Sequence, residues 1–253
     1  MFSDIPIKYF NGTHRVKNPS ETIENFEDKL RVAGITRITN ITNLDRIGVP
    51  VFSAIRPTAQ EGSVSIYAGK GIGESQAKAS AMMEGFERYS AEKQSKDNED
   101  ILIGTFNDMS NPIELESLIL PKSVNINYLK EVKLEWTKMI DIVSEEEYDV
   151  PVNLIFHPYI PKNNDVEAFV KGNTNGLASG NVLEEAVLHG IFEVVERDAW
   201  SIFEITKKNK KEIDLNNIEN DSINDILDKF ERESVDINLL DITADIGIKN
   251  LKN

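Results

Sequence analysis

The sequence contains no cysteine among its 253 residues. This absence excludes a disulfide framework, a thiolate nucleophile and a cysteine-based zinc site, and it fits a reducing cytoplasm. Histidine is almost as scarce, because only His14, His157 and His189 occur and none of them has a metal-ligand spacing. No Gly-x-Ser-x-Gly segment is present, so a serine hydrolase would lack its nucleophile elbow.

The chain also lacks long apolar runs and linkers. No run of apolar residues is long enough to span a bilayer, and the N-terminus has no signal-like apolar segment. No low-complexity tract or long Gly/Ser/Pro linker marks a domain boundary, and a hydrophobic content of 40% can bury a sizeable core. We expect a single domain over 1–253, in a cytoplasmic protein without a membrane partner.

Basic residues are few in comparison with acidic ones. The sequence has 43 Asp and Glu residues against 28 Lys and Arg residues, which gives a formal net charge of -15. Such a charge repels a phosphate backbone and argues against a nucleic-acid partner. A nucleotide such as ATP can still bind an acidic protein when metal ions bridge the two.

A repeated segment stands out against these absences. Glu84-Gly85-Phe86-Glu87-Arg88 recurs as Glu193-Val194-Val195-Glu196-Arg197, and the same shift of 109 residues also aligns a glycine and an alanine in front of each copy. One such segment is most simply a solvated helix face whose arginine pairs with its own glutamates at spacings of one and four. Two copies in register favour a shared site instead.

The repeated glutamates have the spacing of a shared helix face. Glu84 and Glu87 lie one helical turn apart, as do Glu193 and Glu196. Convergence of four carboxylates is unfavourable unless cations are present or some of the carboxylates are protonated. Mg²⁺ is a hard ion that takes oxygen ligands and is commonly shared with phosphates. A glycosidase with paired carboxylates is an alternative, but it would not need the duplicated arginines.

A glycine-rich segment, Gly69-Lys70-Gly71-Ile72-Gly73, precedes the first repeat helix. Its backbone N–H groups and the Lys70 cation near a helix N-terminus form a natural phosphate environment. The segment does not have the Walker A spacing, however, and a flexible strand-to-helix turn explains its glycines equally well.

The periodicity of apolar residues predicts an α+β fold, because strands are grouped around few helices. We expect Ser20 to cap the first helix, and Asn181 with Glu184 to form a capping box on the third. Residues 12–15 are expected to form a turn. The predicted strands are 35–41, 49–55, 63–68, 101–103, 132–142, 150–156 and 235–240, and the predicted helices are 20–33, 74–93, 181–207 and 221–233.

The two repeat copies, with the segments 69–71 and 175–181 that lead into them, resemble the YcaO family over about 10–247. The resemblance implies a pseudo-duplicated ATP-binding core of mixed and antiparallel sheets with packed helices. It also implies that ATP and Mg²⁺ are used to phosphorylate the oxygen of a peptide-backbone amide. A Cys, Ser or Thr side chain then attacks the activated carbon to give an azoline, whereas a sulfide source gives a thioamide.

The resemblance also assigns site residues. Catalysis would consist of positioning and charge neutralisation on a transferring phosphoryl group, without a protein nucleophile, and no individual catalytic residue is predicted. The implied Mg²⁺ ligands are Glu84, Glu87, Glu193 and Glu196. The expected nucleotide and phosphate contacts are Arg15, Thr22, Lys70, Asn181, Glu185 and Arg197.

Within the family, residues 34–38, 44–50 and 55–57 look most like the branch that works with a TfuA partner. In methanogenic archaea that branch is associated with installing thioglycine in methyl-coenzyme M reductase. No fused leader-peptide-binding domain is visible before Phe10, which favours thioamidation over azoline formation by a cyclodehydratase. The implied partners are a peptide or protein substrate and a TfuA-like protein that supplies sulfur, and we expect a homodimer.

The C-terminus departs from the family pattern. Family domains continue well beyond the Asp241-Ile242-Thr243 element, whereas this sequence ends at Asn253. We therefore expect an incomplete domain with an exposed apolar edge at the terminus. Two classes of function follow: an amide-activating enzyme or its incomplete core, and a nucleotide-binding or assembly module without turnover.

Overall fold

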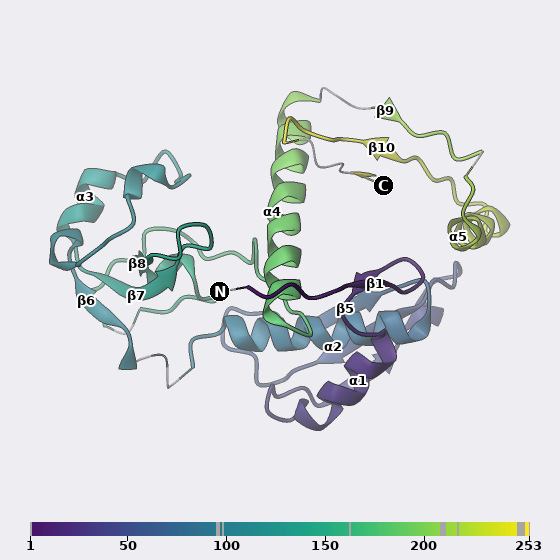
Figure 1. The fold of residues 1–253 in the computed structure, drawn as a ribbon, viewed down its shortest axis with the longest axis horizontal. Coiled ribbons are helices and arrows are strands. Elements are labelled where there is room, and N and C mark those ends of the chain that lie inside the picture. The colour runs from purple at the N-terminus through teal and green to yellow at the C-terminus, as the bar shows by residue number, and fades with distance from the viewer. Residues whose placement is uncertain are drawn as a thin grey trace. The chain divides into compact units, whose positions relative to one another are not determined.

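The structure is a computed structural model that describes residues 2–94, 97, 99–161, 163–207, 211–216, 218–246 and 251–252 (Figure 1). Its contacts divide the chain into two compact units. The small unit contains 59–63 and 88–174, and the large unit contains 2–58, 64–87 and 175–253. The single-domain organisation expected from the sequence stays a prediction.

The large unit is organised around an antiparallel sheet in the order β3-β4-β5. Helix α2 lies very close to this sheet at Gly69, where an added Cβ would be 2.0 Å from the Ala81 nitrogen and 2.3 Å from the Ala77 oxygen. Only glycine allows this approach. Ala77, Ala81 and Met82 are fully buried on the inner face of α2. These elements are β3 (Arg37–Asn40), β4 (Val51–Ile55), β5 (Ile66–Lys70) and α2 (Glu74–Ala91).

A small hairpin begins the chain, where the sequence predicted only a turn. Strands β1 (Lys8–Tyr9) and β2 (His14–Arg15) pair antiparallel, with Lys8 opposite Arg15. The Asn11-Gly12 loop has φ angles of 41° and 93°. Two consecutive positive φ angles are characteristic of a tight type I′ hairpin turn, for which Asn-Gly is a favoured sequence.

Helix α1 (Pro19–Phe26) follows the hairpin and begins two residues earlier than a cap at Ser20 would place it. Asn18 is its N-cap and forms a capping box with Glu21, so the prediction of Ser20 as the cap is wrong. The reason is Pro19, which suits the first helical position because it has no N–H to satisfy. The helix also ends before the predicted residue 33, in a 3₁₀ turn at Glu27–Lys29.

The small unit has its own sheet and its own core. Its three antiparallel strands run in the order β6-β7-β8, and Leu115, Leu129, Leu134 and Trp136 are buried together beside them. The predicted strand at 150–156 is mostly wrong, because β8 ends at Pro151 and a 3₁₀ turn follows. The elements are β6 (Leu102–Gly104), α3 (Ile126–Glu131), β7 (Leu134–Ile140) and β8 (Glu147–Pro151).

The rest of the large unit is built from α4 (Leu183–Thr206), α5 (Asp221–Arg232) and a short sheet in the order β11-β10-β9. The strand predicted at 235–240 is reduced to β10 (Leu240–Asp241), between β9 (Lys211–Glu212) and β11 (Leu251–Lys252). Residues 247–250 and 253 of the predicted apolar C-terminal edge lie outside the described residues.

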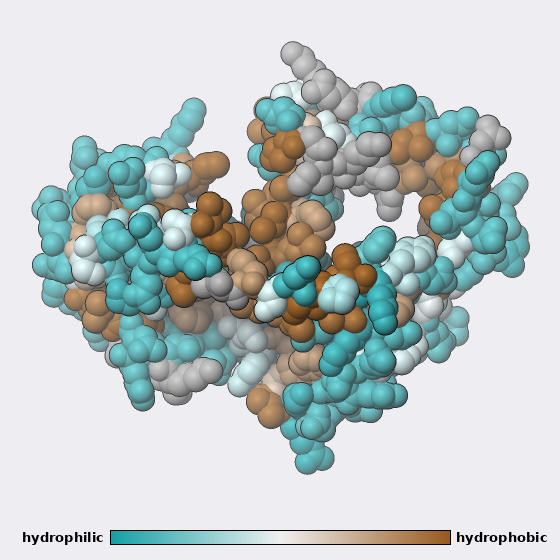
Figure 2. Space-filling view, in the orientation of Figure 1, coloured by the Kyte–Doolittle hydropathy of each residue, from teal (hydrophilic) through white to brown (hydrophobic). Residues whose placement is uncertain are grey.

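Helix α4 carries many apolar side chains on its surface, visible as brown atoms along the helix in Figure 2. No helix in the described ranges is both long enough and apolar enough to cross a membrane. The exposed large apolar residues of α4 are Leu183, Leu188, Ile191, Phe192, Val194, Trp200, Ile202 and Ile205.

Candidate functional site

The repeated glycine and alanine turn out to share a packing role. An added Cβ at Gly71 would lie 2.9 Å from the Ala77 nitrogen, and one at Gly180 would lie 2.6 Å from the Ala186 nitrogen. In both copies the chain therefore turns tightly against the first turn of the following helix. Close packing thus explains Gly69 and Gly71, the structural alternative to a phosphate loop, whereas an added Cβ at Gly73 would meet nothing within 4 Å.

The first glutamate of each copy also makes the same kind of contact. Glu84 accepts a hydrogen bond from the Ala68 N–H at 3.3 Å, and Glu193 accepts one from the Gly176 N–H at 2.8 Å. Each carboxylate is therefore tied to the segment that precedes its own helix. All four residues belong to the large unit. The repeat in the sequence is thus accompanied by a repeated hydrogen bond.

The predicted metal ligands lie on α2 and α4. Glu84, Glu87 and Glu193 are half-buried and Glu196 is exposed. Within the part of the chain that the structure describes, no three Asp, Glu or His side chains are grouped so that they could hold a metal ion. The donor chemistry of the four carboxylates fits Mg²⁺, and their mutual repulsion opposes convergence without a cation. Their assignment as ligands stays a prediction.

The predicted phosphate contacts are the most exposed members of the set. Arg197 has a side chain 52% exposed and pairs with Glu193 at 3.2 Å, four residues earlier on α4. The sequence analysis gave this pairing within one helix as the alternative to a shared site. Such a pair contributes only ~0.3 to 0.5 kcal/mol in isolated helices. Lys70 is exposed at the end of β5.

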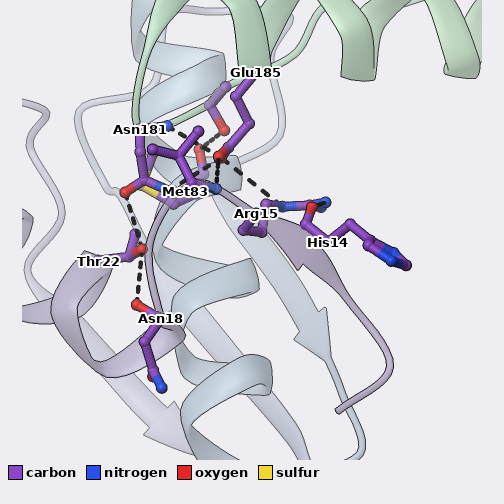
Figure 3. A network of polar contacts seen from close by, with 9 residues as sticks. His14, Arg15, Asn18, Thr22, Met83, Asn181 and Glu185 are labelled. Atoms are coloured by element: carbon purple, nitrogen blue, oxygen red, sulfur yellow. Dashed lines mark hydrogen bonds and ion pairs between the residues drawn. The ribbon is translucent and has the colours of Figure 1, made fainter. Parts of the chain in front are cut away.

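Glu185 is the centre of a partly buried polar network (Figure 3). Its side chain is 9% exposed, and its Oε2 atom accepts a hydrogen bond from the Val16 N–H at 2.8 Å. Its Oε1 atom accepts from the backbone and side-chain nitrogens of Asn181, at 3.1 and 3.0 Å. The Arg15 Nε atom lies 3.9 Å from the same oxygen. One carboxylate thus joins the end of the N-terminal hairpin to the start of α4.

Thr22 extends this network to α1. Its buried hydroxyl donates to the Asn181 Oδ1 atom at 2.9 Å, so the amide of Asn181 is bonded at both ends. The structure therefore brings together Arg15, Thr22, Asn181 and Glu185, four of the six residues predicted to contact a nucleotide. They come from two parts of the sequence at least 159 residues apart.

Asn181 does not have the role of helix cap that the sequence predicted. The N-cap of α4 is Val182, which has no capping side chain, and Glu184 accepts a hydrogen bond from the Ser3 N–H at 2.7 Å instead of closing a capping box. The reason is that Thr22 and Glu185 already occupy the side chain of Asn181. The hydrogen bond from Ser3 holds the pKa of Glu184 below its usual value.

Two members of the site were missed by the sequence analysis. Val16 contributes only its backbone N–H, and the Ser179 hydroxyl donates to the Met83 carbonyl at 3.0 Å, which ties the second repeat turn to α2. A backbone donor leaves no signal in residue type. Ser179 lies in a run of small polar residues that is also typical of any turn.

Known proteins are similar to this chain in sequence and in fold. A protein of Methanothermobacter thermautotrophicus is 51% identical over 233 residues, which cover 91% of this chain and 58% of the relative. A protein encoded in a tfuA 3′ region of Rhizobium leguminosarum bv. trifolii is 31% identical over 242 residues, covering 92% of this chain and 55% of the relative. The chain thus spans about half the length of these curated relatives.

Solved structures give the same picture. YcaO from Methanopyrus kandleri, bound with AMPPCP and Mg²⁺, matches with a TM-score of 0.67 and 28% identity, over 91% of this chain and 56% of that one. A heterocyclase in complex with substrate and cofactor matches with a TM-score of 0.79 and 22% identity, over 98% of this chain and 37% of that one, which supports the fold alone. The predicted class of helices with mixed and antiparallel sheets is confirmed.

The family model that matches residues 68–251 is described as YcaO cyclodehydratase, ATP- and Mg²⁺-binding. This range contains both repeat copies, and it also contains Asn181 and Glu185 of the polar network. The cofactors expected from the sequence, ATP and Mg²⁺, are those of the family. The match over more than half of the chain establishes that this chain belongs to the YcaO family.

Proposed function

We propose that this protein activates a peptide-backbone amide in a reaction that consumes ATP and depends on Mg²⁺. The γ-phosphoryl group would move to the amide oxygen and release ADP. A nucleophile would then bond to the amide carbon, and phosphate would leave with the former amide oxygen. The observation that carries the proposal is the partly buried network around Glu185, which gathers four polar side chains expected to contact the nucleotide.

The predicted side chains would have two roles toward ATP. Arg15, Thr22, Asn181 and Glu185 would hold the nucleotide, while Arg197 and Lys70 would offset negative charge on its phosphates. Mg²⁺, when bound, supplies charge neutralisation on phosphate oxygens, and the predicted ligands for it are Glu84, Glu87, Glu193 and Glu196. No side chain of this set has to act as a nucleophile, which agrees with a chain that has no cysteine.

For the nucleophile, we propose a sulfide source, so that the product is a thioamide such as thioglycine in methyl-coenzyme M reductase. The support is the similarity to a protein from a methanogen and to one encoded beside tfuA, which makes a TfuA-like protein the proposed sulfur-supplying partner. Azoline formation is the second candidate, favoured by the cyclodehydratase description of the family. The mass of the modified peptide separates them, because one reaction exchanges oxygen for sulfur and the other removes a water.

The metal assignment is tested by calorimetry of ATP with Mg²⁺. Glu84→Gln and Glu193→Gln should each weaken binding by about tenfold or more, since each removes a charged oxygen ligand. Glu74→Gln on α2 and Glu204→Gln on α4 are the matched controls, because these exposed glutamates lie on the same helices at other turns. Unchanged affinity in Glu84→Gln and Glu193→Gln would refute a shared site.

Turnover is tested by phosphate release with ATP, a glycine-containing peptide and sulfide. We expect release that depends on the peptide, with a matching mass change in the peptide. Binding of ATP without any peptide-dependent release would refute the enzymatic proposal for this chain and leave the nucleotide-binding module.

The proposed homodimer is supported by the exposed apolar side chains of α4, because such surfaces mark interaction sites.

A further inference from the structure

Gln76 uses both ends of its carboxamide in the first turn of α2. Its Nε2 group donates to the Phe10 carbonyl at 2.8 Å and to the Asn11 carbonyl at 2.6 Å. Its Oε1 atom accepts a hydrogen bond from the Gly73 N–H at 3.1 Å. Both hydrogens of the amide group and one acceptor position are therefore satisfied, and the helix start is bonded directly to the turn of the N-terminal hairpin.

Gln76 and Glu185 are equivalent positions of the internal repeat. The shift of 109 residues that aligns the two glutamate motifs also places Gln76 on Glu185. Each lies against the glycine of its turn, with an added Cβ at Gly71 2.5 Å from the Gln76 Cβ, and one at Gly180 3.0 Å from the Glu185 Cβ. Each also accepts a backbone N–H from the turn itself.

The two side chains present different groups to the hairpin, and each group complements the backbone atoms that it contacts. Gln76 presents an amide donor to two carbonyls at the turn, whereas Glu185 presents a carboxylate acceptor to the Val16 N–H just after β2. The same hairpin is thus held at both ends by the two copies of one structural device. Its strands have only two residues each, and such a short hairpin is not stable without outside contacts.

We propose that Gln76 is a positioning residue of the nucleotide site, a role that rests on the proposed function. By fixing the Asn11-Gly12 turn to α2, it sets where β2 ends and therefore where Arg15 and Val16 meet Glu185. Two contacts reinforce the same turn: the Ser222 hydroxyl donates to the Asn11 Oδ1 atom at 2.6 Å, and Gly12 packs against Ile72. Gln76 itself contacts neither Arg15 nor Glu185 among the hydrogen bonds of the described residues.

Gln76→Glu is the most informative variant. It keeps the oxygen that caps the Gly73 N–H, but it sets a carboxylate oxygen against two carbonyls, which repel it. Gln76→Ala removes the contact without adding charge, so an effect common to both variants does not come from repulsion of ATP. Gln94→Glu is the matched control, because the Gln94 amide also donates to two backbone carbonyls, those of Tyr89 and Glu92, in the small unit.

Two measurements test the role. Hydrogen exchange of the Val16 amide should become at least about fivefold faster in both Gln76 variants and stay unchanged in Gln94→Glu, because exchange reports opening of the contact with Glu185. The dissociation constant of ATP with Mg²⁺ should rise about fivefold or more in the Gln76 variants alone. Wild-type exchange of Val16 in both Gln76 variants would overturn the proposal, as would wild-type ATP affinity in both. If the wild-type protein does not bind ATP, the proposed function fails, while Val16 exchange still decides whether Gln76 positions the hairpin.

Discussion

Replacing Glu185 by glutamine should destabilise the large unit, although the two side chains have nearly the same shape. The carboxylate accepts hydrogen bonds at both oxygens, from the Val16 N–H and from two nitrogens of Asn181. A glutamine has one oxygen and one NH₂ group, so at least one of these donors would face another donor. The side chain is only 9% exposed, so water cannot readily replace the lost partner.

The expected magnitude follows from the number of bonds lost. A hydrogen bond to a charged group contributes ~1.5 to 3 kcal/mol, and leaving a buried donor unsatisfied costs ~1 to 3 kcal/mol. The Arg15 contact adds little, because it is long at 3.9 Å and Arg15 is 39% exposed. We therefore expect Glu185→Gln to lower the free energy of unfolding of the large unit by about 2 to 3 kcal/mol.

Urea denaturation followed by circular dichroism measures this loss. Glu184→Gln is the control, since the neighbouring glutamate accepts the Ser3 N–H and a glutamine keeps an oxygen for it. The midpoint of Glu185→Gln should fall clearly below that of Glu184→Gln at an unchanged slope. Equal midpoints for the two variants would refute the central position of Glu185 in the network.

Two further predictions concern other parts of the chain. Gly69→Ala should destabilise the protein by ~1 to 3 kcal/mol, because its Cβ would meet the backbone of α2, whereas Gly73→Ala should be tolerated, because nothing lies within 4 Å. Equal thermal midpoints for the two alanine variants would contradict this packing. Burial raises the pKa of Asp149, but the hydrogen bonds from Asn111 and Ser110 outweigh it and hold this pKa below the ordinary 3.8. The resulting stability is present above pH 3.8 and is lost as the pH falls through the folded-state pKa. Urea midpoints of Asp149→Asn should therefore fall less steeply in acid than those of the wild type, and parallel curves would contradict the assignment.

The sequence predicted elements well where the pattern is local and long. The helices at 74–93 and 221–233 correspond closely to α2 and α5, because their apolar residues recur at helical spacing over several turns. The family resemblance also named Arg15, Thr22, Asn181 and Glu185 as site residues, but not Val16. Caps and short strands were harder, as Ser20, Asn181 and the strand at 235–240 illustrate. For the two caps a competing interaction decides: Pro19 at the start of α1 and Thr22 on Asn181.

The network itself could not be derived from residue types. Its central bond runs from the backbone of Val16 to Glu185, and any residue except proline offers such a donor. The role of Gln76 was hidden for the same reason, because its partners are the carbonyls of Phe10 and Asn11. Only the shared register of Gln76 and Glu185 within the repeat was present in the sequence, and its meaning required the hydrogen bonds.

The N-terminal segment is bonded to residues that are far away in the sequence, and this separation has a consequence for how the protein is made. The Ser3, Val16 and Thr22 bonds to residues of the second repeat span 181, 169 and 159 positions. Contacts of such separation form late, because the intervening chain must first be ordered. During synthesis the N-terminal hairpin leaves the ribosome first, and the whole of the small unit is made before Asn181 and Glu185 follow. A nascent chain that ends before Asn181 therefore carries Arg15 and Thr22 without Asn181 and Glu185, their partners in the network.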